Sequence, residues 1–289
     1  MIVIVGCIVV IGCVLGGFTW AGGHVGALIH PSEVLTIGGA SLGAMIIMSP
    51  KKVLFDLLHG LKSLLKGSPY NKAMYRELFK LSYDLLRVAR RDGLLALESE
   101  VLNPHEGKII NKYPLMAKDH HAIAFLCDGL SPIIEGIVRP EDMPALLEGE
   151  LKVIENEHHD PINVLTKTAD GLPGFGIVAA VLGIVITMGA IDGPVEEIGH
   201  KVGAALVGTF LGILASYGFI GPMAARMEFL GASEMAFFRT MASLILAFAG
   251  QTSPKVAVDQ ARRGTGTEVR PNRQEMEQLY QEVDSAVAA

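Results

Sequence analysis

The chain has 289 residues, of which half are hydrophobic and only 19% are charged. Because the apolar residues gather in long runs, this composition excludes an ordinary soluble domain and favours membrane segments. The net charge of −6, without a basic stripe of interleaved aromatic residues, gives no support to nucleic-acid binding. Three cysteines, an odd number, argue against a disulfide framework.

Residues 1–49 are expected to hold two membrane helices. The N-terminal stretch is apolar from its second residue and predicts a span over about Ile2–Trp20. No Lys or Arg precedes Lys51, whereas a cleaved signal peptide would have a basic start, so an uncleaved helix is expected. A second span, short and Gly-rich, is predicted over about Val34–Met48.

Residues 50–170 are charged and ordinary in composition, which predicts a helical domain outside the membrane. Met74, Leu78 and Leu81 recur at spacings of four and three, as on one face of an amphipathic helix. No convincing alternating pattern indicates a strand. The expected fold class is therefore an all-α integral membrane protein with four spans and a helical cytoplasmic domain.

A charged stretch within this domain contains Arg90, Arg91 and Glu98. Arg91 and Glu98 are seven residues apart and would share a face if one helix continued through Gly93. Such a cluster is either a solvated surface or an electrostatic docking patch for a charged partner.

Residues 171–226 contain two further apolar runs, Pro173–Ile191 and Val202–Gly221. A helix rises about 1.5 Å per residue and so crosses a hydrocarbon core of about 30 Å in about 20 residues. Both runs carry small or hydroxyl residues at helical spacing, namely Gly176, Ala180, Gly183 and Thr187 in the first and Ala204, Gly208, Gly212 and Ser216 in the second. These stripes either pack the two spans within one subunit or receive the helix of a partner.

The two prolines Pro173 and Pro222 stand at the same mouth of the hairpin, one opening the third span and one closing the fourth. Proline is common in the first turn of a helix and can also end or kink one, so this placement alone indicates no function.

The basic residues predict the topology. Of the 24 Lys and Arg residues, Lys201 alone falls in the links 21–33 and 192–201. The positive-inside rule then puts the large domain, both termini and the segment 227–289 in the cytoplasm.

Within that segment, Ser233–Ala249 is expected to be an amphipathic cytoplasmic helix, since inserting Arg239 into a membrane would cost about 2.5–3.5 kcal/mol. The last residues are polar and are expected to be mobile.

None of the four predicted spans contains Asp, Glu, Lys, Arg or His, so an ion crossing here would need a protonatable group from a partner helix. The sequence has no phosphate loop of Walker type, nucleophile elbow or HExxH motif, and we expect no enzyme activity. The pairs His120-His121 and His158-His159 are adjacent residues, a spacing that suits chelation poorly, so neither a metal nor another cofactor is expected.

Several longer segments together resemble the flagellar stator subunits of the MotA type, in the family that also holds the TolQ and ExbB energisers. The resemblance covers most of the chain and rests on IGGASLGAMI, ARRDGLLALE, DGLPGFGIVAAVLGIVITMGAIDGP and KVGAALVGTFLGILASYGFIGPMA. It implies a multi-pass protein of the bacterial inner membrane. Five subunits would surround a dimer of a MotB-like partner, whose single membrane helix brings the Asp that carries the ion.

The resemblance also implies roles for individual residues. Arg90 and Glu98, with Arg91 beside them, would face the rotor protein FliG. The candidate ion-path and coupling residues are Pro173, Pro222, Ala180, Thr187, Thr209 and Tyr217, of which Ala180, Thr209 and Tyr217 would face the partner helix. Because Ala180 offers no hydroxyl oxygen where sodium-driven relatives are expected to have one, protons are favoured over Na⁺ as the transported ion.

Two alternatives stay open. A TolQ/ExbB-type energiser of envelope machinery would typically have three spans with its N-terminus outside, whereas four spans are predicted here. A stand-alone ion channel or transporter would be expected to have charges or broken helices within the membrane, which only the Pro- and Gly-rich hairpin mouths suggest.

Overall fold

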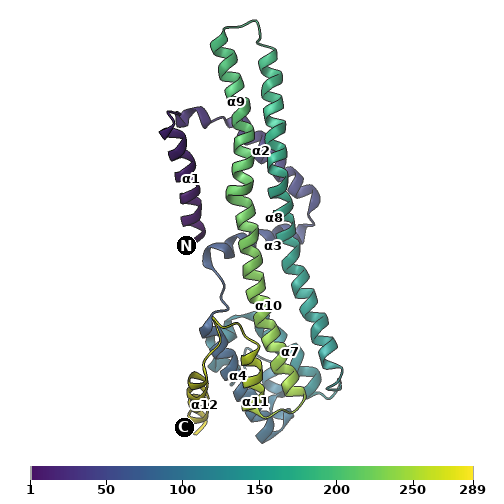
Figure 1. The fold of residues 1–289 in the computed structure, drawn as a ribbon. Coiled ribbons are helices and arrows are strands. Elements are labelled where there is room, and N and C mark those ends of the chain that lie inside the picture. The colour runs from purple at the N-terminus through teal and green to yellow at the C-terminus, as the bar shows by residue number, and fades with distance from the viewer. Residues whose placement is uncertain (1, 289) are drawn as a thin grey trace. The chain divides into compact units, whose positions relative to one another are not determined.

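A computed structural model describes residues 2–288, which are almost entirely helical and contain no strand (Figure 1). In chain order the elements are α1 Ile2–Trp20, η1 Val25–Leu28, α2 Pro31–Met48, α3 Lys51–Lys66, α4 Lys72–Asp92, η2 Leu94–Leu97, α5 Glu98–Leu102, η3 Ile110–Lys112, α6 Pro114–Lys118, α7 His120–Ile134, α8 Met143–Met188, α9 Val195–Ile213, η4 Leu214–Ile220, α10 Gly221–Ala249, α11 Pro254–Arg263 and α12 Arg273–Ala288. Within this range, four helical stretches are long and apolar enough to cross a membrane: α1, α2 with η1, α8, and the run from α9 to α10. The predicted fold class is confirmed.

The chain folds into two compact units whose boundaries differ from the predicted segments. The first, here called the membrane unit, comprises residues 1–67 and Asn156–Gly231; the second, here called the helical unit, comprises Ser68–Glu155 and residues 232–289. The difference has a simple cause: α8 and α10 pass from one unit to the other without a break, so no loop marks the boundary.

The second membrane helix begins earlier than predicted. α2 starts at Pro31 rather than at Val34, with proline in the first turn, where its missing N–H leaves no hydrogen bond unmade. Glu33 is therefore part of this helix, and the prediction that the spans hold no titratable side chain is wrong at this position. α8 also starts early, at Met143, and contains Pro161 and Pro173 within its length.

The α8–α9 hairpin is the centre of the membrane unit (Figure 1). The two backbones approach closely at glycine: a Cβ atom placed on Gly212 would lie 2.7 Å from the carbonyl oxygen of Leu172 and 2.9 Å from Cα of Gly176. Further along, a Cβ on Gly183 would lie 2.7 Å from Cβ of Ala205. The small-residue stripes therefore pack α8 against α9 within one subunit.

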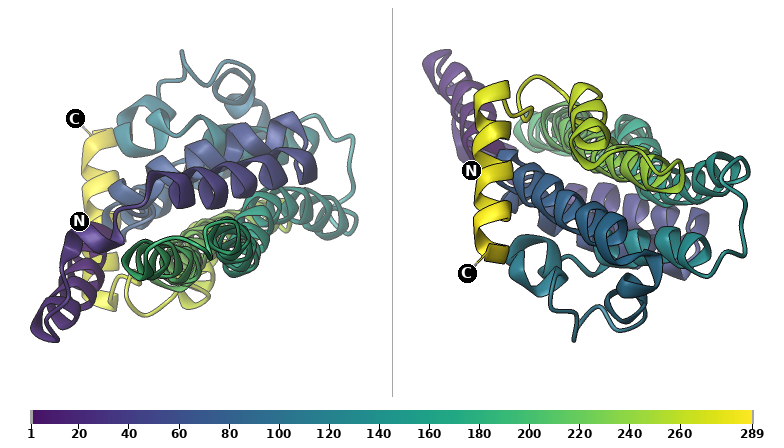
Figure 2. Two further views of the ribbon diagram at one scale, coloured as in Figure 1. Left: turned by 90° about the horizontal axis from the view of Figure 1, so that it is seen from above. Right: turned by 90° about the horizontal axis from the view of Figure 1, so that it is seen from below.

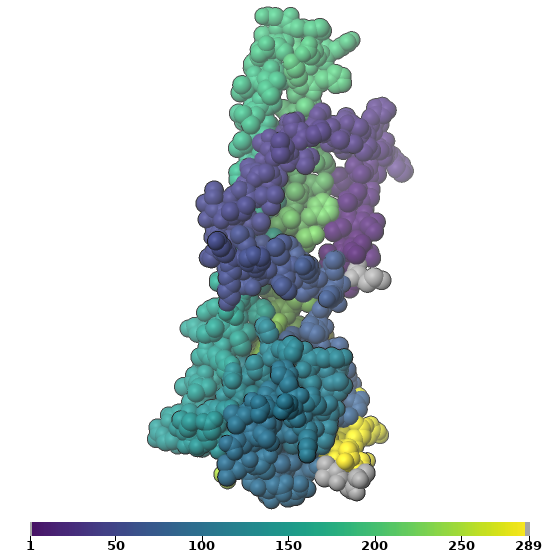
Figure 3. Space-filling model, turned by 180° about the vertical axis from the view of Figure 1, so that it is seen from behind, coloured from purple at the N-terminus to yellow at the C-terminus, as the bar shows by residue number. Residues whose placement is uncertain are grey.

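The other membrane helices lie around this hairpin. α2 packs against α9 and runs along one side of the hairpin (Figure 2, left). α2 and α3 cover part of it on the face drawn in Figure 3, where α1 stands to the side. α1 has no buried residue and makes little contact; Val10 approaches η4, with its Cγ1 3.2 Å from a Cβ placed on Gly218. α3 turns one face, with Val53 and Leu57, into the membrane unit and leaves Phe55 exposed.

The region after the fourth span is better ordered than predicted. Ser233–Ala249 is helical but is the continuation of α10 rather than a separate amphipathic helix, because Phe237, Phe238 and Met241 are fully buried in the core of the helical unit. The polar C-terminal segment was expected to be mobile, and this is also wrong. It forms α11 and α12, which bury Val258 and Leu279 completely against the same core.

The close α8–α9 contact predicts a strong position dependence of substitutions on α9. Gly212→Val should prevent correct assembly, since even its Cβ collides with backbone, and overpacking of this kind costs about 1–3 kcal/mol or more. Gly203→Val is the matched control, because a Cβ at Gly203 meets nothing within 4 Å. Membrane yield and thermal unfolding in detergent would measure both; equal behaviour of the two variants would contradict this packing.

Candidate functional site

Two of the predicted ion-path residues, Ala180 and Thr209, are brought together at the α8–α9 contact. A Cβ on Gly208 would lie 3.4 Å from the backbone nitrogen of Ala180, and a Cβ on Gly176 would lie 3.3 Å from Cα of Thr209. Both side chains are half-buried in the single subunit. The residue of α8 that is fully buried here is Ala179, one position from the predicted Ala180.

Thr187 is placed differently. Its side chain is 1% exposed, and its hydroxyl group donates a hydrogen bond of 2.8 Å to the carbonyl oxygen of Gly183 on its own helix. This is the usual way a threonine satisfies its hydroxyl inside a helix. Thr187 is therefore buried within one subunit, and this burial, rather than the donated hydrogen bond, keeps its oxygen away from an ion.

The fourth membrane helix changes its winding immediately before Pro222. Leu214–Ile220 is a π-helix, and the Gly221 N–H donates to the carbonyl oxygen of Ser216, five residues back. Proline has no N–H and its ring clashes with the carbonyl four residues earlier, so a widened turn accommodates Pro222 without ending the helix. π-turns are frequent at functional sites, and the exposed Tyr217 lies within this one.

Glu33 is a candidate that the sequence analysis missed. It is buried, with 8% of its surface exposed, and its Oε2 lies 2.7 Å from the position of a Cβ on Gly208 of α9. The sequence signal was present, since a proline two residues before an acidic residue is typical of a helix start.

The charged candidates lie at the end of α4 and just beyond it. Gly93, with φ of 90°, ends α4 after Asp92, so the expectation that Arg91 and Glu98 share one helical face is wrong. Glu98 instead begins the short helix α5. Arg90, Arg91 and Glu98 are all exposed.

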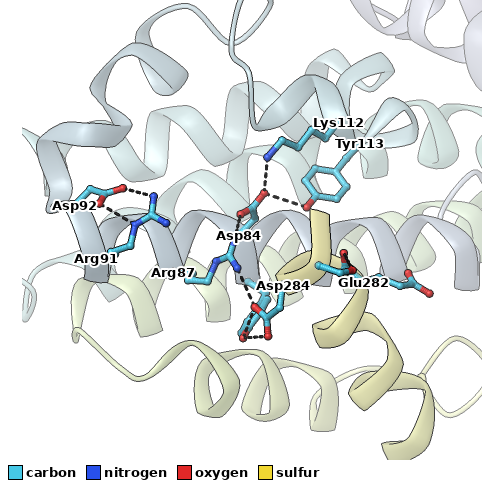
Figure 4. Close-up of polar contacts among 10 residues, drawn as sticks. Asp84, Arg87, Arg91, Asp92, Lys112, Tyr113, Glu282 and Asp284 are labelled. Carbon is cyan, nitrogen blue, oxygen red and sulfur yellow. Dashed lines mark hydrogen bonds and ion pairs between the residues drawn. The ribbon is translucent and has the colours of Figure 1, made fainter. Parts of the chain in front are cut away.

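Arg91 is paired locally rather than free. Its guanidinium makes two hydrogen bonds to the carboxylate of Asp92, Nε to Oδ1 at 2.9 Å and Nη2 to Oδ2 at 2.7 Å (Figure 4). This hydrogen bonding lowers the pKa of Asp92. Of the three exposed candidates, Arg91 is thus tied to Asp92, and Arg90 and Glu98 are the charged side chains better placed to contact a partner. The sequence alone does not show this difference.

A buried acidic residue holds the end of α4 in place. Asp84 is 2% exposed and accepts hydrogen bonds from Arg87 (3.1 Å), Lys112 (3.2 Å) and Tyr113 (3.3 Å) (Figure 4). Burial, with the nearby charge of Asp84, raises the pKa of the Tyr113 hydroxyl. Because the buried carboxylate of Asp84 would be left without partners if these donors were lost, this network braces the helix that carries Arg90.

The C-terminal helix α12 lies alongside α4 and reinforces this arrangement (Figure 2, right). Asp284 accepts a hydrogen bond of 2.9 Å from Arg87, and acidic residues of α12 pair with basic ones of α4 in Lys72–Glu275 and Lys80–Glu282. Hydrogen bonding to Lys80 lowers the pKa of Glu282. These ion pairs are partly exposed and individually weak. Buried apolar residues such as Leu279 therefore contribute most of the free energy that holds α12 against α4.

The histidine pairs do not assemble into a metal site. Among residues 2–288, no group of three or more His, Cys, Asp or Glu side chains is placed to hold a metal ion. The ring of His120 packs instead against the ring of His105, with centroids 5.4 Å apart.

Comparison with known proteins places these features in a family. Residues 4–93 match the family described as motility protein A N-terminal, and residues 117–240 match the MotA/TolQ/ExbB proton channel family. The chain is 36% identical to motility protein A of Salmonella typhimurium and of Escherichia coli over 96% of its length and 94% of theirs. It is 37% identical to chemotaxis protein LafT of Vibrio parahaemolyticus, over 96% of this chain and 97% of that one.

Two solved structures have the same fold. The flagellar MotAB stator complex of Bacillus subtilis gives a TM-score of 0.72 at 25% identity, covering 89% of this chain and 92% of the other. The MotAB structure of C. jejuni gives 0.77 at 20% identity, covering 94% and 98%. The chain therefore belongs to the MotA/TolQ/ExbB proton channel family, among its flagellar stator subunits of the motility protein A type.

Proposed function

We propose that this stator subunit works with a MotB-like partner to couple ion entry into the cell to rotation of the flagellar motor. Five copies would surround a dimer of the partner, whose single membrane helix brings an Asp. The solved relatives are described as MotAB complexes, which supports such a partner. The family is one of proton channels, and nothing indicates enzyme activity.

The observation that carries this proposal is the chemical nature of the α8–α9 hairpin. From Pro173 to Ile191 and from Val202 to Gly221 the two helices contain no Asp, Glu, Lys, Arg or His, and their glycines are used to hold the two backbones together. Such a wall can line an ion path but cannot bind a proton itself, so the partner's carboxylate would have to do so. Each charge that enters supplies about 2.3 kcal/mol per 100 mV of membrane potential.

Individual residues receive roles within this proposal. Ala180, Thr209 and Tyr217 would face the partner helix, and Thr187 would support the wall through its buried packing. Pro173 and Pro222 would transmit changes at the path to α8 and α10, since Pro222 adjoins the π-helix. Protons are favoured over Na⁺ because Ala180 adds no oxygen ligand and the hydroxyl of Thr187 is buried within the subunit.

The proposed topology puts both termini and the helical unit in the cytoplasm, with lipid around α1 and α2. The helical unit would then reach the rotor protein FliG through Arg90 and Glu98. An energiser of the TolQ/ExbB type is the less favoured alternative, because relatives that cover nearly the whole chain are motility proteins. A stand-alone channel is disfavoured by the lack of titratable groups along the α8–α9 hairpin.

Ion flux in liposomes tests the coupling to a partner. The purified chain alone should pass no protons, and co-reconstitution with the one-span partner should produce a proton flux that disappears when the partner's membrane Asp is changed to Asn. A steady proton current through the chain without the partner would favour the stand-alone channel.

Charge reversal tests the rotor contact. Arg90→Glu or Glu98→Lys should reduce swimming speed at least fivefold, and an opposite change on the rotor face should restore it. Arg139→Glu is the matched control, since Arg139 is also exposed on the helical unit, and it should have little effect. If Arg90→Glu instead abolishes membrane assembly, Arg90 is structural and the rotor role fails.

A further inference from the structure

Glu33 differs from the other buried carboxylates of the described residues. Asp84 is held by three donors, and Glu100 accepts hydrogen bonds from the backbone nitrogens of Lys108 and Ile109 at 2.7 and 2.9 Å. The residue Glu33 is 8% exposed, yet its carboxyl group makes no hydrogen bond or ion pair within residues 2–288. It is therefore the buried acidic residue of the membrane unit whose carboxyl group has no protein partner in that range.

The carboxyl group lies directly on the backbone of α9. Its Oε2 occupies the space that a side chain at Gly208 would need, at 2.7 Å from the Cβ position, so the Glu33 side chain would have to move to admit a larger residue. The same Cβ position lies 3.1 Å from Cβ of Ala179 and 3.4 Å from the backbone nitrogen of Ala180. Glu33 thus reaches the α8–α9 contact beside the candidate ion-path residue Ala180.

Few groups are available to balance a negative charge there. The residues of α9 around Gly208 are Ala205, Val207 and Gly212, none of which titrates. The neighbouring titratable group along the chain is His30, the residue before α2, whose ring nitrogen lies 3.1 Å from the carbonyl oxygen of Ala27. A buried carboxylate without a bonded partner is costly, so this group is stable as the acid or with a cation beside it.

We propose that Glu33 is a proton-exchanging side chain of the ion path, which takes up a proton from the link between α1 and α2 and releases it toward Thr209 and the partner's carboxylate. In each cycle the carboxylate gains one proton and becomes the acid, then loses that proton and returns to its charged form. The inference rests on the proposed function, since it adds a protonatable group of this chain to a path whose other carboxylate belongs to the partner.

The competing explanation is that Glu33 stays protonated and only fills the space between α2 and α9. Substitution by glutamine distinguishes this structural role from proton exchange. Glu33→Gln keeps the size and polarity of the side chain but cannot exchange a proton. Glu33→Asp keeps the exchange with a shorter stem. Glu196→Gln removes an exposed carboxylate from the first turn of α9 and serves as the matched control.

The experiment measures proton flux per assembled complex in liposomes that contain the chain with its co-purified partner. We expect Glu33→Gln to lose at least fivefold in flux while assembling normally, Glu33→Asp to keep at least half, and Glu196→Gln to match the unmodified complex. Unchanged flux in Glu33→Gln would overturn the proposal. If the unmodified complex is itself silent, the proposed function fails, which is a separate result.

A second measurement needs no variant and covers the case in which Glu33→Gln does not assemble. A hydrophobic carbodiimide reacts with protonated carboxyl groups in apolar surroundings, and mass spectrometry locates the modified residue. We expect modification of Glu33 in the intact complex, decreasing as pH rises, because a proton-exchanging group becomes charged. Absence of modification across the pH range, or modification that does not depend on pH, would overturn the proposal.

Discussion

The membrane unit depends on the direct contact between the backbones of α8 and α9. Gly212 lies against the carbonyl oxygen of Leu172, and Gly183 lies against Ala205, so the helices approach more closely than any larger side chain would allow. In lipid, where apolar side chains gain nothing from avoiding water, such close packing is a principal source of helix association. It also leaves the larger apolar side chains, including Ile177 and Val181, exposed on the outside of the pair, available to lipid or neighbouring subunits.

The same contact decides what this hairpin can do chemically. Its glycines are used for packing and Thr187 is buried, so the hairpin offers an ion neutral hydroxyl groups such as that of Thr209 but no charged side chain. Charge has to come from elsewhere: in our account from the partner's carboxylate and from Glu33, which reaches α9 because Gly208 leaves space for it. In this account the glycines have two roles: they let α8 and α9 pack closely, and Gly208 leaves room for Glu33 beside the proposed ion path.

Continuous helices link the membrane unit to the helical unit. α8 extends over 46 residues and buries Leu147 near its start, and α10 follows the π-helix and buries Phe237. No loop interrupts α10 between Pro222 and the helical unit. In the helical unit the end of α4 is held by the buried Asp84 network, as the proposed rotor contact through Arg90 requires.

The sequence was sufficient for the fold class, for the four membrane stretches and for the first span, because long apolar runs depend on local composition. It was not sufficient where contacts between residues far apart in the sequence determine the structure. α12 looks polar, yet Leu279 and Tyr280 are buried against α4 and neighbouring helices, and neither contact can be read from local spacing. The start of α2 was missed because the predicted span was drawn from the apolar run, which begins only at Val34, and the buried position of Glu33 follows only from the approach of α9.

The candidate site was predicted in part. The small-residue stripes correctly indicated close packing, but Ala179 is fully buried at this contact and Ala180 only half-buried, a difference of one position that helical spacing does not resolve. The π-helix has no clear signature beyond Pro222 and its neighbouring glycines. The pairing of Arg91 with Asp92 depends on the end of α4 at Gly93, which sequence periodicity alone did not fix.

Cysteine cross-linking in native membranes tests the α8–α9 contact most directly. In a chain whose Cys7, Cys13 and Cys127 are replaced by Ala, the pair Gly183→Cys and Ala205→Cys brings two Cβ atoms within the roughly 3.5–4.5 Å that a disulfide needs, allowing for slight relaxation. We predict that mild oxidation joins this pair within one chain. The control pair Gly183→Cys and Gly203→Cys should stay reduced. Failure of the first pair to close, or equal closure of both, would contradict the account.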